Sequence, residues 1–394
     1  MAENRKDSKG RVLRTGEYER TDGRYYYVYT DAAGKRAYIY AKDLKELRKL
    51  KQEAERDLAD GICSANSKMT LNQLFKIHME LKNDLKQSTA DNYSRMWKSC
   101  VEKSAIGRKK ISDLKKVHIM GFYQDCIKSG KKRNTVRLLH NLIFSSLELA
   151  ADSDFIRKNP AKGAMLQIKR DAAEKVPLTE DDIRNVMDFC MQSRTYSVYV
   201  PFLTVAVGTC LRCGELTGLT WSDIDMKRRT ISINHQLIYK NYGEGCRFYI
   251  SEPKTEAGKR IIPMTEAVYQ AFISIKEQNM MTGKRSSAEI DGYRDFVFVT
   301  KSGWPFADNA VNSFLRNIRN AYNKEHQDSM LPHLSAHILR HTGCTRFAAS
   351  GMDVKTLQNI MGHSDAGVTM NVYNHSSFER TEKEMRRLDN AMNF

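Results

Sequence analysis

The stretch MGHSDAGVTMNVYNH, residues 361–375, places a single tyrosine, Tyr373, between His363 and His375. A tyrosine hydroxyl has an unperturbed pKa of about 10. It therefore attacks a substrate at neutral pH only when a base or a cationic pocket assists it. If Tyr373 is a nucleophile, the rest of the chain must supply that assistance.

Three upstream motifs hold side chains of the required kinds. Arg212 lies in GTCLRCGEL with Glu215 three residues later, Lys254 lies in EPKTEAGKR, and His337 and Arg340 lie together in HILR. Arginine presents a planar fork that matches two phosphate oxygens, and two forks can clamp a phosphodiester transition state. The set therefore suits strand cleavage in a nucleic acid.

The remaining candidates suit proton transfer. Lys254, at a turn between two expected strands, can donate a proton to a leaving 5′-oxygen, and His337 is suited to accept the tyrosine proton. Lys259 and Arg260 lie near the same turn, so the choice of Lys254 among them stays open. The motifs hold no carboxylate cluster for magnesium, so we expect the arginines to do the work of a metal, with no cofactor.

Each of these residues also has a simpler structural interpretation. A single Arg, Lys or Tyr in a basic protein is more often a surface residue. Glu215 can pair with Arg212 or with a helix terminus. His363 can be an ordinary residue at a helix end, and His375 can face solvent.

Composition narrows the class of protein. The 394 residues carry 64 Lys+Arg against 47 Asp+Glu, a formal charge of +17, which favours a polyanionic partner such as nucleic acid; the alternative is a generally basic, soluble protein. The sequence contains neither a signal peptide nor an apolar run of about 18 residues, so we expect no membrane association and a cytoplasmic location.

Eight cysteines do not form a dense disulfide framework, and Cys210 and Cys213 lack a second ligand pair for zinc, so we expect two helix-face thiols and no metal.

The N-terminal segment predicts a small sheet covered by a helix. Residues 11–40 contain three aromatic or β-branched runs separated by Asp-Gly and Ala-Gly pairs, typical of antiparallel hairpins. Leucines at helical spacing over residues 41–58 predict one helix on the sheet. We expect the aromatic residues to pack in the core rather than to stack on bases. The basic residues that we expect on the outer strand faces, as candidate DNA contacts, are Arg14, Arg20, Arg24, Lys35 and Arg36.

A helical region follows, from about residue 69 to 160. Thr70, Thr89 and Thr135 each precede a segment with apolar residues at three- and four-residue spacing, so each is expected to start a helix. Residues 82–137 hold 15 Lys+Arg and 5 Asp+Glu, a balance of 15 − 5 = +10, which suits binding to a DNA backbone. The candidate contacts there are Lys98, Arg108, Lys109, Lys131, Arg133 and Arg137.

The polar segment IKRDAAEKVP is expected to be a linker, and Thr179 with its following acids is expected to cap the first helix of a further domain. That domain holds three expected strands, TISINHQLIY, CRFYISEPK and RIIPM, before helices resume. At the end of the chain, after Ser376 and Ser377, an apolar stripe of Phe378, Met385, Leu388 and Met392 predicts a tail helix. The expected domain boundaries are 1–65, 66–165, a linker at 166–176, and 177–394.

Taken in order, these motifs resemble a tyrosine recombinase of the lambda-integrase type, most closely the integrases of conjugative transposons. The resemblance spans the whole chain and rests on LRCGEL at 211–216, HILRHT at 337–342, MGHSDAGVTMNVYNH at 361–375 and the Lys-Thr pair at 254–255. It implies an active site around the tyrosine, with a supporting glutamate, made of Arg212, Glu215, Lys254, His337, Arg340, His363 and Tyr373.

The resemblance also implies an architecture and partners. The fold expected is multidomain and mainly α with small β-sheets: an N-terminal arm-binding sheet, a helical core-binding bundle, and a mixed α/β catalytic domain. Tyr373 would form a 3′-phosphotyrosyl link that a partner strand resolves without ATP, during excision and integration of a mobile element. Double-stranded DNA with core and arm sites, a tetramer in the synapse that exchanges tail helices, and an accessory excision or DNA-bending protein are the expected partners.

Two other functions remain open at this level. A type IB topoisomerase shares the pocket and the fold but would relax supercoils alone and would not need an arm-binding sheet. A non-catalytic architectural protein explains the charge and the N-terminal sheet but leaves the ordered set of six residues as coincidence.

Overall fold

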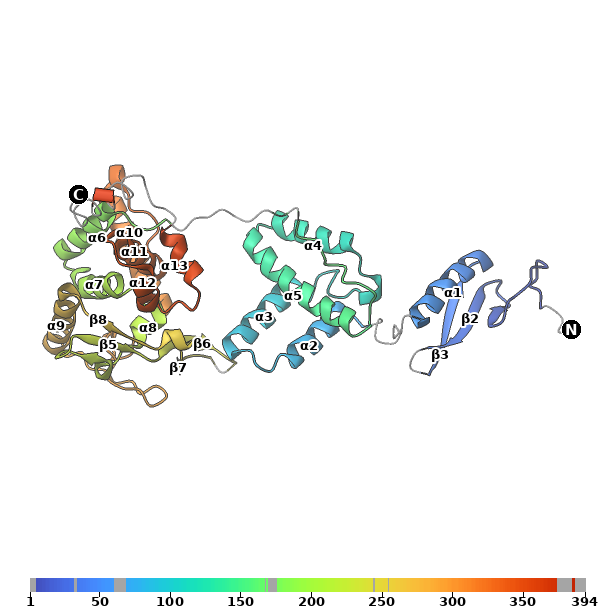
Figure 1. The fold of residues 1–394 in the computed structure, drawn as a ribbon, viewed down its shortest axis with the longest axis horizontal. Coiled ribbons are helices and arrows are strands. Elements are labelled where there is room, and N and C mark those ends of the chain that lie inside the picture. Colours follow the sequence, from blue (N-terminus) through green and yellow to red (C-terminus); the bar gives the residue numbers. More distant parts are fainter. Residues whose placement is uncertain are drawn as a thin grey trace. The chain divides into compact units, whose positions relative to one another are not determined.

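The computed structural model describes residues 5–31, 34–59, 69–166, 168, 176–243, 245–253, 255–373 and 385–386. The chain divides into two compact units, Met1–Ala173 and Glu174–Phe394. Most described elements are helices, and three small antiparallel sheets accompany them (Figure 1), so the expected fold class is confirmed. Among the helices described, none combines the length and apolar character that a bilayer span requires. The finer domain boundaries remain predictions.

The N-terminal part of the first unit is a three-stranded antiparallel sheet with one helix, as the hairpin pattern predicts. The central strand pairs with both others, Tyr26 lying opposite Tyr18 on one side and Tyr40 on the other. Leu44 and Leu47 of the helix are fully buried against Tyr25 and Ala41 in its small core. The elements are β1 Glu17–Glu19, β2 Tyr25–Thr30, β3 Arg36–Ala41 and α1 Leu44–Ala59.

The sheet has two different faces, because side chains alternate along a strand. One face packs on α1. The other carries four tyrosines whose rings lie side by side, with centroid distances from 5.0 to 6.5 Å; we call it the tyrosine face, and its members are Tyr18, Tyr26, Tyr38 and Tyr40. Tyr38 is 51% exposed and Tyr40 is 55% exposed. The expectation that the aromatic residues pack in the core is therefore wrong for this face, since a single helix can cover only one side of a sheet.

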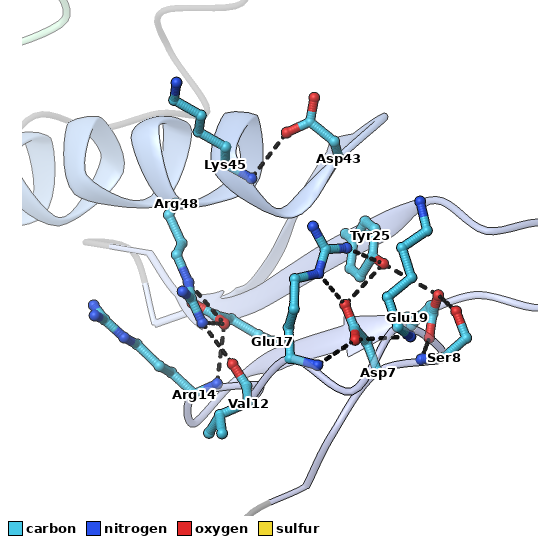
Figure 2. A network of polar contacts seen from close by, with 12 residues as sticks. Asp7, Ser8, Val12, Arg14, Glu17, Glu19, Tyr25, Asp43, Lys45 and Arg48 are labelled. Carbon is cyan, nitrogen blue, oxygen red and sulfur yellow. Dashed lines mark hydrogen bonds and ion pairs between the residues drawn. The ribbon is translucent and has the colours of Figure 1, made fainter.

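Polar contacts tie the N-terminal arm and α1 to the sheet (Figure 2). The buried carboxylate of Asp7 accepts hydrogen bonds from Arg11 Nε at 2.7 Å and from the Tyr25 hydroxyl at 3.0 Å. The buried Glu17 of β1 accepts from Arg48 Nη2 of α1 at 3.2 Å. Because both carboxylates are buried and paired, they attach the arm and the helix α1 to the sheet.

The helical part of the first unit packs four helices around one apolar cluster. Thr70 caps the first of them as expected: its hydroxyl accepts from the amide of Gln73, and its own amide donates to the Gln73 side-chain oxygen. The helices expected to start at Thr89 and Thr135 instead begin two residues earlier, because the backbone carbonyls of Lys86 and Lys132, rather than threonine side chains, accept the first bonds. The sequence reasoning did not name α4. The helices are α2 Leu71–Leu81, α3 Gln87–Cys100, α4 Lys116–Lys128 and α5 Arg133–Asp152.

The second unit is built mainly of helices around a large apolar core. It begins with the helix that Thr179 was expected to cap, and the Thr179 hydroxyl accepts from the amide of Asp182 at 3.1 Å. Helix α13 packs against α11 and α12. The helices are α6 Glu180–Gln192, α7 Val200–Thr209, α8 Cys213–Gly218, α9 Glu266–Met281, α10 Asp308–Glu325, α11 Ala336–Ala349, α12 Val354–Met361 and α13 Ala366–Tyr373.

The strands of the second unit form two separate sheets, in the orders β4-β5-β8 and β6-β7. The run TISINHQLIY, expected to be one strand, is two strands in different sheets. Asn234 and His235 separate the two strands, and the His235 side chain is buried, with Nε2 lying 2.7 Å from the carbonyl oxygen of Gly218. The strands are β4 Ile224–Asp225, β5 Thr230–Ile233, β6 Gln236–Asn241, β7 Cys246–Ser251 and β8 Arg260–Pro263.

Two glycines let helix α8 lie directly on strand β6. A Cβ on Gly214 would come within 2.7 Å of the carbonyl oxygen of Leu237, and a Cβ on Gly218 within 2.9 Å of the amide nitrogen of the same residue. The backbones therefore approach closely only because both positions lack a side chain. This contact fixes the helix that begins immediately after Arg212.

Candidate active site

Three segments far apart in sequence bring candidate residues together in the second unit. Arg212 stands immediately before α8, Arg340 lies in the middle of α11, and His363 follows the end of α12. Their side chains meet around the last residues of α12, where Arg340 Nη2 lies 2.9 Å from His363 Nε2. The structure thus brings these three side chains together.

The C-terminus of α12 is bound by three arginines, one for each successive carbonyl group. Arg260 Nε donates to the carbonyl of Ile360 at 2.7 Å. Arg340 Nη2 donates to Met361 at 2.7 Å, and Arg212 Nη2 donates to Gly362 at 3.1 Å. The last carbonyls of a helix lack partners within the helix and carry its negative partial charge, so this helix end orders the cations.

Gly362 is needed at the end of α12. Its φ of +61° is left-handed, the conformation that glycine adopts at helix ends at least cost. A Cβ there would also lie 2.9 Å from Arg260 Nη1 and 3.0 Å from the carbonyl oxygen of Ala257. The glycine thus serves both the turn that leads to His363 and the close approach of the arginines.

Glu215 is the counter-ion of the cluster and is buried. One carboxylate oxygen accepts from Arg212 Nη1 at 2.7 Å, and the other accepts from Arg260 Nη2 at 2.8 Å. The second oxygen lies 4.0 Å from Arg340 Nη1. Burial alone would raise the pKa of this carboxyl, but the hydrogen bond and charge of Arg260, with the charge of Arg212, bring the pKa below its usual range. Glu215 is therefore ionised at neutral pH.

Arg340 is held in a largely dry setting. Its side chain is 7% exposed, against 42% for Arg212. Nη1 donates to the carbonyl oxygen of Cys210 at 2.7 Å. Burial first, and then repulsion by Arg212, lower the pKa of Arg340 to about 10, while Glu215 acts in the opposite direction. The guanidinium therefore remains charged at neutral pH.

The carbonyl group that accepts the hydrogen bond from Arg340 Nη1 belongs to a residue with a strained backbone. Cys210 has φ +55° and ends α7 in the left-handed region, which is uncommon for a residue with a side chain. The expectation of two helix-face thiols is therefore wrong for Cys210, while Cys213 is the first residue of α8. Burial raises the pKa of both thiols, which makes them packing groups rather than nucleophiles.

His363 is a neutral histidine with a defined tautomer. A guanidinium only donates hydrogen bonds, so His363 Nε2 must accept from Arg340. The proton of the neutral ring is therefore on Nδ1, which donates to the Thr369 hydroxyl at 3.0 Å. Burial, followed by the charges of Arg340, Arg212 and Arg260, lowers the pKa of His363 to about 4. The cationic charge of the pocket thus comes from arginines.

The other predicted site residues are placed less completely. His337 lies in the first turn of α11, three residues before Arg340, and its side chain is exposed. Tyr373 is the last residue of α13, and the structure describes its backbone alone. Lys254 and His375 lie outside the described residues. The loop that contains Lys254 joins β7 to β8, as expected from the sequence.

Sequence reasoning missed several residues that build the site. Arg260 was noted only as an alternative to the turn lysine, yet it bonds Glu215 directly. The Thr369 hydroxyl lies 3.0 Å from His363 Nδ1, and Gln358 Nε2 donates to the carbonyl of His363 at 2.9 Å. Of the described residues, no group of three or more His, Cys, Asp or Glu is placed to hold a metal ion.

The basic residues expected to contact DNA are mostly at the surface. All five near the N-terminal sheet are exposed. In the helical part of the first unit, the exposed ones are Lys98, Arg108 and Arg133. The half-buried ones are Lys109, Lys131 and Arg137. Of the expected tail helix, Met385 and Arg386 are described, and both are helical and exposed. The rest of the tail lies outside the described residues.

Known proteins are similar to this chain over almost its whole length. The family model described as "Phage integrase family" matches residues 177–380, and the one described as "DNA binding domain of tn916 integrase" matches residues 1–59. The chain is 33% identical to the transposase from transposon Tn1545 of Streptococcus pneumoniae, over 99% of this chain and 98% of that protein. It is 32% identical to the transposase from transposon Tn916 of Enterococcus faecalis, with the same coverage.

A solved structure is similar as well. The integrase of transposon Tn1549 in complex with a circular intermediate DNA matches with a TM-score of 0.73 at 32% sequence identity. The match covers 81% of this chain and 99% of that chain. The likeness therefore includes both the helical part of the first unit and the second unit.

We predict that Glu215→Gln destabilises the folded protein by about 3 kcal/mol, because removing one partner of a buried ion pair leaves the other charges uncompensated. Urea unfolding at neutral pH measures the difference. Wild type should also lose stability as the pH falls through the lowered pKa of Glu215, because protonation removes the counter-charge. Glu266→Gln, at the exposed pair with Arg229, is the matched control and should change little; equal effects of the two substitutions would contradict the buried pairing.

Proposed function

Because the chain belongs to the phage integrase family and is a tyrosine recombinase, we propose that it excises and integrates a conjugative transposon. The curated relatives are named transposases of such elements, and the similar solved integrase was bound to circular intermediate DNA and to transposon right end DNA. Site-specific cleavage at element ends, followed by rejoining to a new partner strand, is the reaction that this likeness supports.

In the proposed reaction, the oxygen of Tyr373 attacks the scissile phosphorus and the 5′-oxygen leaves. The tyrosine proton passes to His337, and Lys254 protonates the leaving oxygen, so charge and protons balance. The product is a 3′-phosphotyrosyl link, which the 5′-hydroxyl of a partner strand attacks in turn. The energy of the cleaved bond is held in the link, and neither ATP nor a metal is required.

The observation that carries this proposal is the convergence of Arg212, Arg340 and His363 beside the helix that ends in Tyr373. Helix α13 packs on α11, which carries Arg340, and on α12, which leads to His363. The two proposed phosphate-binding arginines differ in exposure, so Arg212 can reach substrate directly while Arg340 supplies a buried charge. Preorganised cations of this kind stabilise the charge of a phosphoryl transition state.

The tyrosine face of the N-terminal sheet is our candidate for arm-site DNA binding. The guanidinium of Arg5 lies over Tyr18 at 4.8 Å, and that of Arg20 lies over Tyr40 at 5.9 Å. Arg36 shares the face by strand alternation. A sheet with exposed aromatic and cationic side chains suits the major groove, which admits a β-ribbon. The basic surface of the helical part would contact core DNA.

Assembly is the finer part of the proposal. Two duplexes, each cut on both strands, need four active sites, so a tetramer is expected in the synapse. The apolar stripe of residues 377–392 would dock on a neighbouring copy and restrain Tyr373 until assembly is complete. An accessory excision or DNA-bending protein would assist in bringing arm and core sites together. A reaction on bacterial DNA would take place in the cytoplasm.

The two rival functions fit less of the molecule. A type IB topoisomerase would have no use for the N-terminal sheet and its tyrosine face. A purely architectural protein would have no use for a buried, charged pocket beside a tyrosine. Relaxation of plasmid without a specific site by a monomer would favour the topoisomerase.

We predict that Tyr373→Phe abolishes the covalent adduct and leaves DNA affinity unchanged, because only the nucleophilic oxygen is lost. A nicked suicide substrate that carries an element end, followed by a denaturing gel and peptide mapping, detects the adduct. Tyr269→Phe removes a phenol hydroxyl from α9 of the same unit and should cleave normally. An adduct formed by Tyr373→Phe would show that another residue is the nucleophile.

We predict that Arg36→Ala weakens arm-site binding and reduces the slope of log affinity against log salt by about 1, as expected for one lost phosphate contact. Lys49→Ala removes the same charge from the exposed surface of α1, which packs on the opposite face, and serves as control. Fluorescence anisotropy at several salt concentrations measures both variants. Equal slopes for the two would argue against the tyrosine face.

We predict that deletion of the chain from Ser377 onward weakens assembly on DNA, because the proposed contact between copies is lost. Analytical ultracentrifugation of complexes with core-site DNA compares the truncated and full chains. The truncated chain should still cleave an isolated half-site, at the rate of the full chain or faster. Unchanged oligomerisation on DNA would reject the tail exchange.

A further inference from the structure

Arg260 is a third arginine of the site to which the proposed mechanism gives no role. It is the first residue of β8, and its side chain is 7% exposed. Its three nitrogens bind three different elements: Nε donates to Ile360 of α12 at 2.7 Å, Nη1 donates to Gly258 at 2.8 Å, and Nη2 donates to Glu215 of α8 at 2.8 Å. One planar side chain thus fixes the distances between three segments of chain.

The bonding of Arg260 differs from that of the two proposed phosphate-binding arginines. Among the described residues, the side-chain bonds of Arg212 and Arg340 use Nη1 and Nη2, whereas those of Arg260 also use Nε. Three of the five N–H donors of Arg260, one on each nitrogen, are bound by protein, and the side chain is only 7% exposed. The geometry therefore favours a role within the protein.

The groups that Arg260 binds are those that place the reacting cations. Glu215 orients Arg212 through both its main-chain and its side-chain nitrogen, at 3.0 and 2.7 Å. Ile360 lies immediately before the carbonyls that bind Arg340 and Arg212, and three residues before His363. Without Arg260, Glu215 would keep one guanidinium partner and the end of α12 would lose one of its three.

We propose that Arg260 is a positioning residue for strand cleavage: by holding Glu215 and the end of α12 at a fixed separation, it sets the spacing of Arg212, Arg340 and His363 without touching DNA. This inference rests on the proposed function of those residues. Lysine cannot replace Arg260, because a single ammonium group lacks the planar fork that reaches three acceptors in one plane.

The test compares Arg260→Lys and Arg260→Gln with wild type and with a control, Arg229→Gln, which removes an arginine from an exposed ion pair in the same unit. Three quantities are measured for each full-length protein: single-turnover adduct formation on saturating nicked core-site DNA, DNA affinity over a range of salt, and thermal unfolding. Arg260→Lys keeps the charge, so it remains informative if Arg260→Gln fails to fold.

We expect Arg260→Lys to form the adduct about 10- to 100-fold more slowly at saturating DNA, because small displacements of reacting groups have effects of that size. Its affinity and salt slope should equal those of wild type, and Arg229→Gln should cleave at the normal rate. Cleavage by Arg260→Lys within twofold of wild type would overturn the proposal. So would a salt slope reduced by about 1 in Arg260→Gln, which would indicate a lost phosphate contact.

A double-variant cycle tests the route through Glu215. If Arg260 acts by holding Glu215, combining Arg260→Lys with Glu215→Gln should slow cleavage by much less than the product of the two single effects; multiplicative effects would overturn it. The wild-type adduct is the separate test of the proposed function. If wild type forms no adduct at Tyr373, the function is wrong, whereas a normal wild-type adduct with fast cleavage by Arg260→Lys removes only the positioning role.

Discussion

The C-terminus of helix α12 is the constraint on which the candidate site depends. A helix must end with carbonyl groups that lack helical partners, and a buried end must find donors elsewhere. Here the donors are three guanidinium groups from three segments, bound to Ile360, Met361 and Gly362 in succession. The unpaired carbonyl groups of this helix end thus bring three positively charged side chains together. The left-handed Gly362 that ends the helix leaves space for the arginines.

Collecting three arginines in a largely dry region is unfavourable unless a counter-charge is present. Glu215 supplies it, which leaves Arg212, Arg260 and Arg340 against one negative charge among the described residues of this cluster, with His363 neutral. Both oxygens of Glu215 are occupied by Arg212 and Arg260, so the carboxylate orders its neighbours as well as neutralising one of them. In the proposed function, this surplus positive charge would stabilise the phosphodiester transition state without rearrangement of the pocket.

The parts of the molecule that sequence predicted well are those fixed by local chemistry. Thr70 and Thr179 cap their helices as expected because a threonine hydroxyl can accept from the free amides of a first helical turn, whereas Thr89 and Thr135 lie inside helices that begin earlier. Arg260 could not be chosen over Lys259 from sequence, since its inward direction depends on the pairing of β5 with β8, where Ile233 lies opposite it. The interruption between β5 and β6 was not predicted either. The buried His235 beside it contacts the carbonyl of Gly218, which belongs to another element.

The electrostatics of the pocket also determine when His363 can carry a proton. Burial and three nearby arginines hold the pKa of its imidazole near 4, so the ring is neutral at the pH of a cell. A phosphate bound between Arg212 and Arg340 adds negative charge beside the ring, which favours the protonated form and raises that pKa. In the proposed reaction, the bond between the ring and Arg340 would also change if that guanidinium turned toward a phosphate oxygen. The proton affinity of His363 would then be coupled to substrate, because the arginines that suppress its charge are the ones proposed to bind the phosphate.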